Sequence, residues 1–99
     1  MVKKIIWTKA ADKAFDNITA YLHDNASHQA AHNFASLVYQ KIDSLVKYPT
    51  QGRRVITTKS VRVLNLGKNH QLYYRIEGKT LFISSFFDTR QNPTKRPFG

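Results

Sequence analysis

Apolar and polar residues alternate most regularly in the last 40 or so residues of the chain, where three successive β-strands are predicted. Short polar segments containing Gly67 and Gly78 separate these strands. Glycine readily adopts the positive φ of tight hairpin turns, so neighbouring strands are expected to be antiparallel. The predicted strands are Val61–Leu66, Gln71–Ile76 and Leu81–Phe86.

The middle strand indicates which face of this sheet is buried. Successive side chains point to opposite faces of a strand. Gln71, Tyr73 and Arg75 therefore share a face that is predicted to be partly solvent-exposed and cationic. The other face is predicted to pack on the core and carries Leu72, Tyr74 and Ile76.

Upstream of this sheet, apolar residues recur at the three- and four-residue spacing of a helix face. One helix is predicted from Lys9 to about Asp24, and a second follows Ser27, a favourable N-cap residue. Tyr48-Pro49 ends the second helix, because proline disfavours helical geometry in the residue before it. The short link between the helices predicts an antiparallel hairpin whose apolar stripes cover the sheet.

Two further strands complete the predicted architecture, Lys3–Thr8 before the helices and Arg53–Thr57 at an edge of the sheet after them. This order of elements indicates an α+β fold with two layers: an N-terminal strand, a helix hairpin and a mostly antiparallel, curved sheet. A chain of 99 residues is long enough for one such core but not for two, so residues 1–99 are expected to form a single domain.

Positive charge is concentrated in the half of the chain that forms this sheet. The net charge is +10. Residues 49–99 contain ten lysines and arginines against two acidic residues, whereas residues 1–48 contain six against four. This asymmetry suggests a polyanionic partner, either nucleic acid or an acidic protein segment.

The composition excludes several classes of protein. There is no cysteine, so a disulfide framework, a thiolate zinc site and a cysteine nucleophile are ruled out, and the cytoplasm is the expected compartment. No apolar run is long enough to span a membrane. His28 and His32 lie one helical turn apart but lack a matching third ligand, so no metal or other cofactor is expected.

The candidate functional residues lie in the basic half of the chain. Tyr73 offers a ring for base stacking, and His70 is able to titrate near neutral pH. Asp88 either orients Arg90 or takes a proton, and the alternative is a local ion pair that fixes the chain after the last strand. The basic residues that are able to converge on phosphate groups are Arg53, Arg54, Arg62, Lys68, Arg75 and Arg90.

Four segments in this order resemble the RelE/ParE superfamily of toxins from type II toxin–antitoxin modules, the plasmid stabilisation proteins. The segments are IIWTKAADKAF, KIDSLVKYPTQGRR, VRVLNLGKNHQLYYRIEGKTLFI and FFDTRQNP. The resemblance covers nearly the whole chain and implies a curved sheet that holds the target, in the strand order 1-5-4-3-2, with both helices on one face. It also implies a cognate antitoxin, whose acidic and apolar segment neutralises the toxin.

The superfamily has two activities. RelE-like members cut mRNA at the ribosome without a metal, and ParE-like members poison DNA gyrase. Arg62 and Arg90 match basic positions of the nucleases, whereas Leu64 and Gln71 replace basic residues, and the terminal tyrosine or histidine of several nucleases is missing. The resemblance therefore favours a ParE-like gyrase poison, with a ribosome-dependent endoribonuclease or a non-toxic RNA-binding module as alternatives.

Each activity implies a role for the candidate residues. In a nuclease, Arg62 and Arg90 stabilise phosphorane charge from the same target-facing side, and His70 or Asp88 exchanges the proton. In a gyrase poison no catalytic set is needed, and the basic face is a contact surface. The expected target-binding residues are Arg53, Arg54, Lys68, Tyr73 and Arg75.

Overall fold

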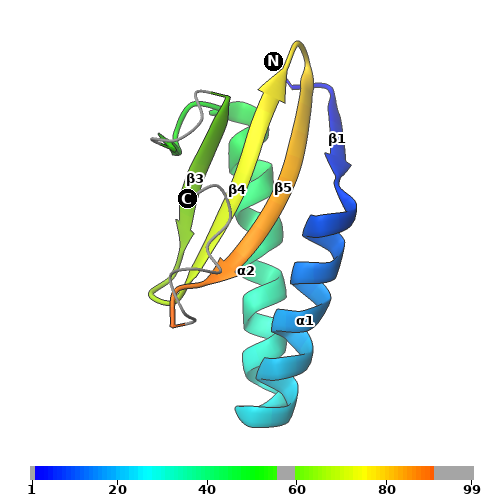
Figure 1. Cartoon of the computed structure of the whole chain (residues 1–99), viewed down its shortest axis with the longest axis vertical. Helices are drawn as coiled ribbons and strands as arrows, with labels where there is room; N and C mark the ends of the chain where they lie inside the picture. Colours follow the sequence, from blue (N-terminus) through cyan, green and yellow to red (C-terminus); the bar gives the residue numbers. More distant parts are fainter. Residues whose placement is uncertain (1, 56–59, 91–99) are drawn as a thin grey trace.

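The computed structural model describes residues 2–55 and 60–90 and contains two helices and five strands within them. A mixed sheet has the strand order β1-β5-β4-β3-β2 (Figure 1). β1 pairs with β5 in parallel, and the other neighbouring strands are antiparallel. The predicted fold class and strand order are confirmed. The elements are β1 (Lys4–Trp7), α1 (Lys9–Asn25), α2 (His28–Lys47), β2 (Arg53–Arg54), β3 (Val61–Leu66), β4 (His70–Glu77) and β5 (Thr80–Asp88).

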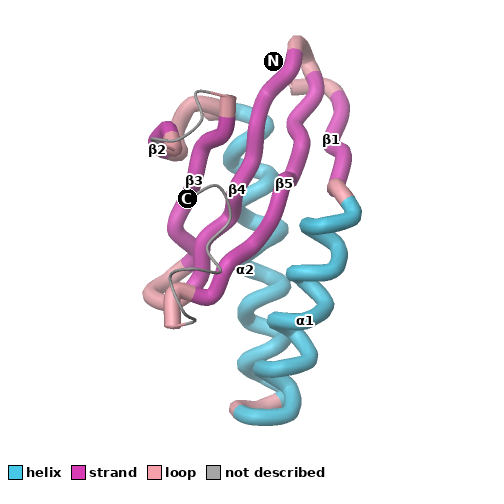
Figure 2. The backbone as a smooth tube through the Cα atoms, in the orientation of Figure 1, coloured by secondary structure: helices cyan, strands magenta, loops and turns pink. Residues whose placement is uncertain are grey.

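Both helices begin at the hydroxyl caps that the sequence provides. The Thr8 hydroxyl accepts the N–H of Ala11 at 3.1 Å, and the Ser27 hydroxyl accepts the N–H of Ala30 at 2.9 Å. The two helices pack on the same face of the sheet, and α2 passes behind β3, β4 and β5 in Figure 1. Figure 2 shows that the end of this helix hairpin extends beyond the lower end of the sheet.

The main core lies between the helices and the sheet. α2 contributes a stripe of buried residues at helical spacing, Phe34, Val38, Ile42 and Leu45. The sheet contributes Leu66, Leu72, Tyr74, Leu81, Ile83 and Phe86. Their burial holds the two layers together, because each large apolar side chain removed from water stabilises the fold by about 1.5–3 kcal/mol.

The opposite face of the sheet differs from the prediction. Tyr73 is only 3% exposed and belongs to a second apolar cluster with Val61, Val63 and Phe87. Its hydroxyl donates to Gln71 Oε1 at 3.1 Å. The prediction of an exposed Tyr73 ring for base stacking is therefore wrong, because apolar residues of the neighbouring strands lie on the same face and pack against that ring.

A β-bulge in β5 explains how apolar residues reach both faces. Tyr73 pairs with Ser85 while the next residue, Tyr74, pairs with Ile83, so Ser84 is an extra residue in β5. The bulge lets Ile83 and Phe86 both join the main core although they are three residues apart. Strict alternation along β5 could not have placed both of them there.

The edge strand β2 is shorter than predicted. Only Arg53 and Arg54 pair with β3, and the Val55 N–H still donates to the Val61 carbonyl at 3.0 Å. The remainder of the predicted strand, residues 56–57, lies outside the described residues. Within the described chain, no helix has the length and apolar character needed to cross a membrane.

Candidate functional site

The lower end of the sheet holds a compact ion pair between Asp88 and Arg90. Asp88, the last residue of β5, accepts the Arg90 backbone N–H at 2.9 Å and its Nε–H at 3.0 Å on Oδ1. The Arg90 Nη2 donates to Oδ2 at 2.8 Å. Asp88 is 7% exposed, and the hydrogen bonds from the Arg90 side chain lower its pKa and raise the pKa of Arg90. The alternative of a local ion pair is confirmed, and a carboxylate held in this way is a poor proton acceptor.

His70 lies directly opposite Asp88 at the start of β4. Its Nε2 is 3.7 Å from Asp88 Oδ2, which is too long for a hydrogen bond, and its ring centroid is 4.7 Å from that of Phe34. Burial lowers the pKa of His70 below its usual 6.5, and the Asp88 carboxylate opposes this shift. The imidazole is therefore mainly neutral at pH 7.

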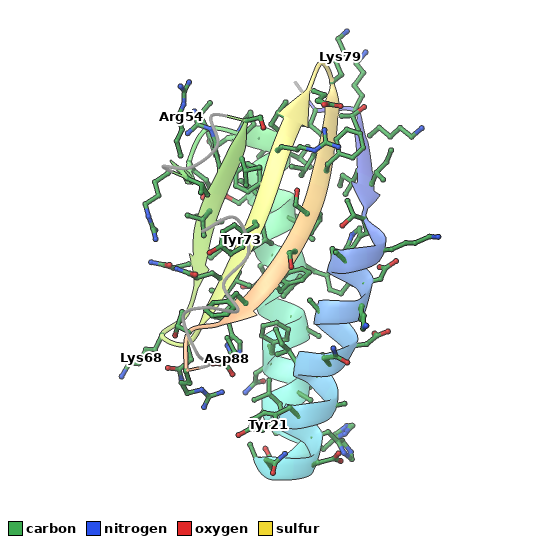
Figure 3. All side chains as sticks on the ribbon, viewed as in Figure 1. Tyr21, Arg54, Lys68, Tyr73, Lys79 and Asp88 are labelled. Carbon is green, nitrogen blue, oxygen red and sulfur yellow. The ribbon has the colours of Figure 1, made fainter. Side chains whose placement is uncertain are left out.

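An open pocket of about 350 Å³ lies between this ion pair and α1. It is lined by Asn17, Ile18, Tyr21, Asp88 and Arg90. Figure 3 shows Asp88 at the end of β5 and Tyr21 below it on the projecting helix hairpin. The pocket exposes about half of the Arg90 side chain to solvent, so the outer edge of its guanidinium is able to contact a partner.

A second polar network lies at the other end of the sheet. The buried Tyr74 hydroxyl donates to the Pro49 carbonyl at 2.7 Å and accepts the Gly52 N–H at 2.9 Å. Arg62 Nη1 donates to the carbonyls of Gly52 at 2.7 Å and Thr50 at 3.2 Å. Tyr74 and Arg62 therefore fix the loop that connects α2 to β2.

Gly52 is required in this loop by close packing. A Cβ at this position would lie 2.7 Å from the Tyr74 hydroxyl oxygen and 2.9 Å from the Val63 carbonyl oxygen. Carbon atoms do not approach oxygen atoms so closely, and the Val63 carbonyl belongs to a strand that cannot easily move. The sequence placed Tyr74 on the face that packs on the core but did not indicate its contact with Gly52, so this network was not predicted.

The two arginines that the nuclease hypothesis combines are offset from each other along the sheet. Arg62 pairs with Tyr74, which pairs with Ile83 on β5. Asp88, which holds Arg90, lies five residues further along β5, or about 16 Å at 3.3 Å per residue. The strand register thus separates Arg62 from the Asp88–Arg90 pair by about five residues along the sheet, and the placement of both arginines on the same target-facing side stays a prediction.

The remaining predicted contact residues are divided between several surfaces. Arg53 and Arg54 are exposed on β2, and Lys68 is exposed in the turn between β3 and β4, at the other end of the sheet (Figure 3). Arg75 is occupied within the molecule: its guanidinium lies 4.0 Å from the Phe82 ring centroid, and its Nη1 is 2.6 Å from Glu77 Oε1. The basic residues thus form separate patches and do not converge on one point.

Comparisons with known proteins identify a family and several solved structures that resemble this chain. The sequence model of one family, described as the ParE toxin of the type II toxin–antitoxin system parDE, matches residues 5–93. No curated protein sequence gives a significant match.

Several solved structures share the fold at low sequence identity. A chromosomal ParDE system from P. aeruginosa has a TM-score of 0.74 and 20% identity, over 88% of this chain and 96% of that chain. A YoeB/ParE toxin from Agrobacterium tumefaciens has a TM-score of 0.67 and 12% identity, over 87% and 98%. YafQ from E. coli has a TM-score of 0.60 and 12% identity, over 89% and 94%.

Proposed function

Because this chain belongs to the ParE toxin family of type II toxin–antitoxin systems, we propose that it inhibits growth by binding DNA gyrase. A cognate antitoxin, whose acidic and apolar segment orders on the toxin surface, neutralises it. The toxin acts in the cytoplasm, where gyrase acts on DNA. It needs no cofactor for this activity, since binding to gyrase is sufficient.

The separation of Arg62 and Arg90 is the observation that supports this proposal over RNA cleavage. Cleavage by attack of a 2′-hydroxyl needs a base, an acid and cations around one phosphate. Here the strand register separates Arg62 from Arg90 by about five residues along the sheet, and both carboxylate oxygens of Asp88 already accept hydrogen bonds from Arg90. Separate basic patches suit a contact surface for a large partner, which is able to touch several of them at once.

The proposal is tested by producing the chain alone and following two readouts in parallel. We expect growth arrest with a DNA-damage response, inhibited supercoiling by purified gyrase, and intact mRNA. Ribosome-dependent mRNA cleavage with unaffected supercoiling would instead support the RelE-like activity. Normal growth under confirmed expression would support a non-toxic RNA-binding module.

Arg90→Ala provides a second test of the same proposal. If the pocket beside Asp88 contacts gyrase, this variant should inhibit supercoiling less than the wild type. Lys13→Ala, which removes one exposed charge on α1, is the matched control. Equal inhibition by the wild type and both variants would remove Arg90 from the contact surface.

A further inference from the structure

A small pocket at the β2 end of the sheet brings together two arginines and, among the residues that the structure describes, no carboxylate. It has a volume of about 280 Å³ and lies at the opposite end of the sheet from the Asp88–Arg90 pair. Two hydroxyl-bearing residues and two apolar residues complete its walls. The lining residues are Pro49, Thr50, Arg54, Ser60, Arg62 and Ile76.

The two arginines face each other across the β2–β3 pair. Arg54 and Arg62 are direct partners in this antiparallel register, where Cβ atoms lie about 5 Å apart and like charges destabilise the pairing. Within the described residues, no salt bridge to either guanidinium is found. The pocket therefore carries unbalanced positive charge, which a bound anion would neutralise.

Arg62 is already oriented for such an anion. Its Nη1 is held by the carbonyls of Gly52 and Thr50, and Gly52 is itself held by the buried Tyr74 hydroxyl. The Nε–Nη2 edge has no hydrogen bond to a described residue, and this edge forms paired hydrogen bonds with carboxylates and phosphates. A guanidinium fixed in advance loses less conformational entropy when a ligand binds.

The lining of the pocket favours a carboxylate on a short apolar stem. One free arginine edge matches the two oxygens of a planar carboxylate, and Arg54 lies opposite to neutralise it. Pro49 and Ile76 provide apolar walls for methylene groups. Building on the proposed function, we propose that Arg54 and Arg62 bind a glutamate side chain of the acidic antitoxin segment.

The pocket can be tested without gyrase or the antitoxin, so the result stands apart from the test of the proposed function. The probe is N-acetylglutamate N-methylamide, titrated into the purified chain at low salt. We expect saturable shifts in the NMR signals of the Gly52 and Arg54 amides and the Arg62 Nε–H. Arg54→Gln should weaken the apparent affinity about tenfold, because it removes one charge-assisted interaction.

Arg53→Gln is the matched control, because it removes the same charge one residue earlier in β2. Arg53 pairs with Val63, so its side chain points to the other face of the sheet. It should change the apparent affinity less than twofold. Arg62→Lys keeps the charge but lacks the fork, so it should also weaken binding. Equal losses for Arg53→Gln and Arg54→Gln would overturn the proposal, because they would indicate general attraction to a basic protein. Inorganic phosphate that binds as tightly as the probe would overturn it as well, in favour of a phosphate site.

Discussion

At the scale of single residues, the Tyr74 hydroxyl has the clearest energetic role. Tyr74→Phe would leave the Gly52 N–H and the Pro49 carbonyl without their hydrogen-bond partner. We expect the free energy of unfolding to fall by about 1–3 kcal/mol, the usual cost of unsatisfied buried polar groups. Urea denaturation measures this change. Tyr48→Phe is the control, because the Tyr48 side chain is 66% exposed and its substitution should change stability by less than about 0.5 kcal/mol.

The pKa of His70 predicts how stability depends on pH. Its pKa is lowered in the folded chain, so the unfolded chain binds a proton first as the pH falls below 6.5. The folded state should therefore lose stability as the pH falls from 7 towards the lower pKa of the native imidazole. His70→Asn should show less of this loss when unfolding is measured at pH 7 and pH 5.5.

His32→Asn is the control for that measurement, because His32 is exposed on α2. It should follow the wild-type profile, and identical profiles for all three chains would contradict a role for His70.

Asp88 acts at lower pH. Its pKa is also lowered, mainly by Arg90, so the stability it contributes is present above 3.8 and is lost as the pH falls through its lower native value.

The sequence indicated which residues belong to these sites better than it indicated how those residues are arranged in space. Asp88 and Arg90 are two residues apart, so their ion pair depends on local spacing alone and could be anticipated. The distance between Arg62 and Arg90 depends on the register of three strands, which residue types do not specify. The contact between Tyr74 and Gly52 spans 22 positions and requires a close approach that no local pattern records.

At the scale of elements, the caps of the helices contribute measurable stability. Ser27→Ala removes the hydroxyl that accepts the Ala30 N–H at the start of α2. We expect a loss of about 1 kcal/mol in the free energy of unfolding. Ser36→Ala lies within the same helix, where alanine has the higher helix propensity, and should be neutral or slightly stabilising. A Ser27→Ala variant as stable as the wild type would show that the tip of the hairpin adds nothing to the global stability.

Helices and strands were predictable because their periodicities are strong and their ends carry recognisable residues. Ser27 and Pro49 placed the limits of α2 to within one or two residues. The burial of Tyr73 was not predictable from its own strand, because it depends on Val61, Val63 and Phe87 from the neighbouring strands. The bulge at Ser84 was missed for the same reason, since a bulge is defined only by the pairing of two strands.

At the scale of the whole molecule, the net charge of +10 predicts that binding to an acidic partner depends on salt. The affinity for gyrase, the proposed target, should fall as the salt concentration rises from about 0.05 to 0.5 M in a measurement with purified components, since exposed charges are increasingly screened. Lys68→Gln should make this dependence shallower if the turn between β3 and β4 contacts the target. Binding that does not change with salt would show that apolar contacts dominate the interface.

The parallel pairing of β1 with β5 has a consequence for how the toxin is made. Lys4 pairs with Thr80, and the Thr8 hydroxyl donates to the Ser84 carbonyl, so among the described strands β1 pairs with β5. Synthesis proceeds from the N-terminus, and the nascent chain therefore cannot pair β1 with its partner until β5 has left the ribosome. A prematurely terminated fragment that ends before Thr80 lacks the strand on which β1 and Trp7 pack. Such a fragment would be open to proteases, and under the proposed function it would not inhibit growth until β5 has been made.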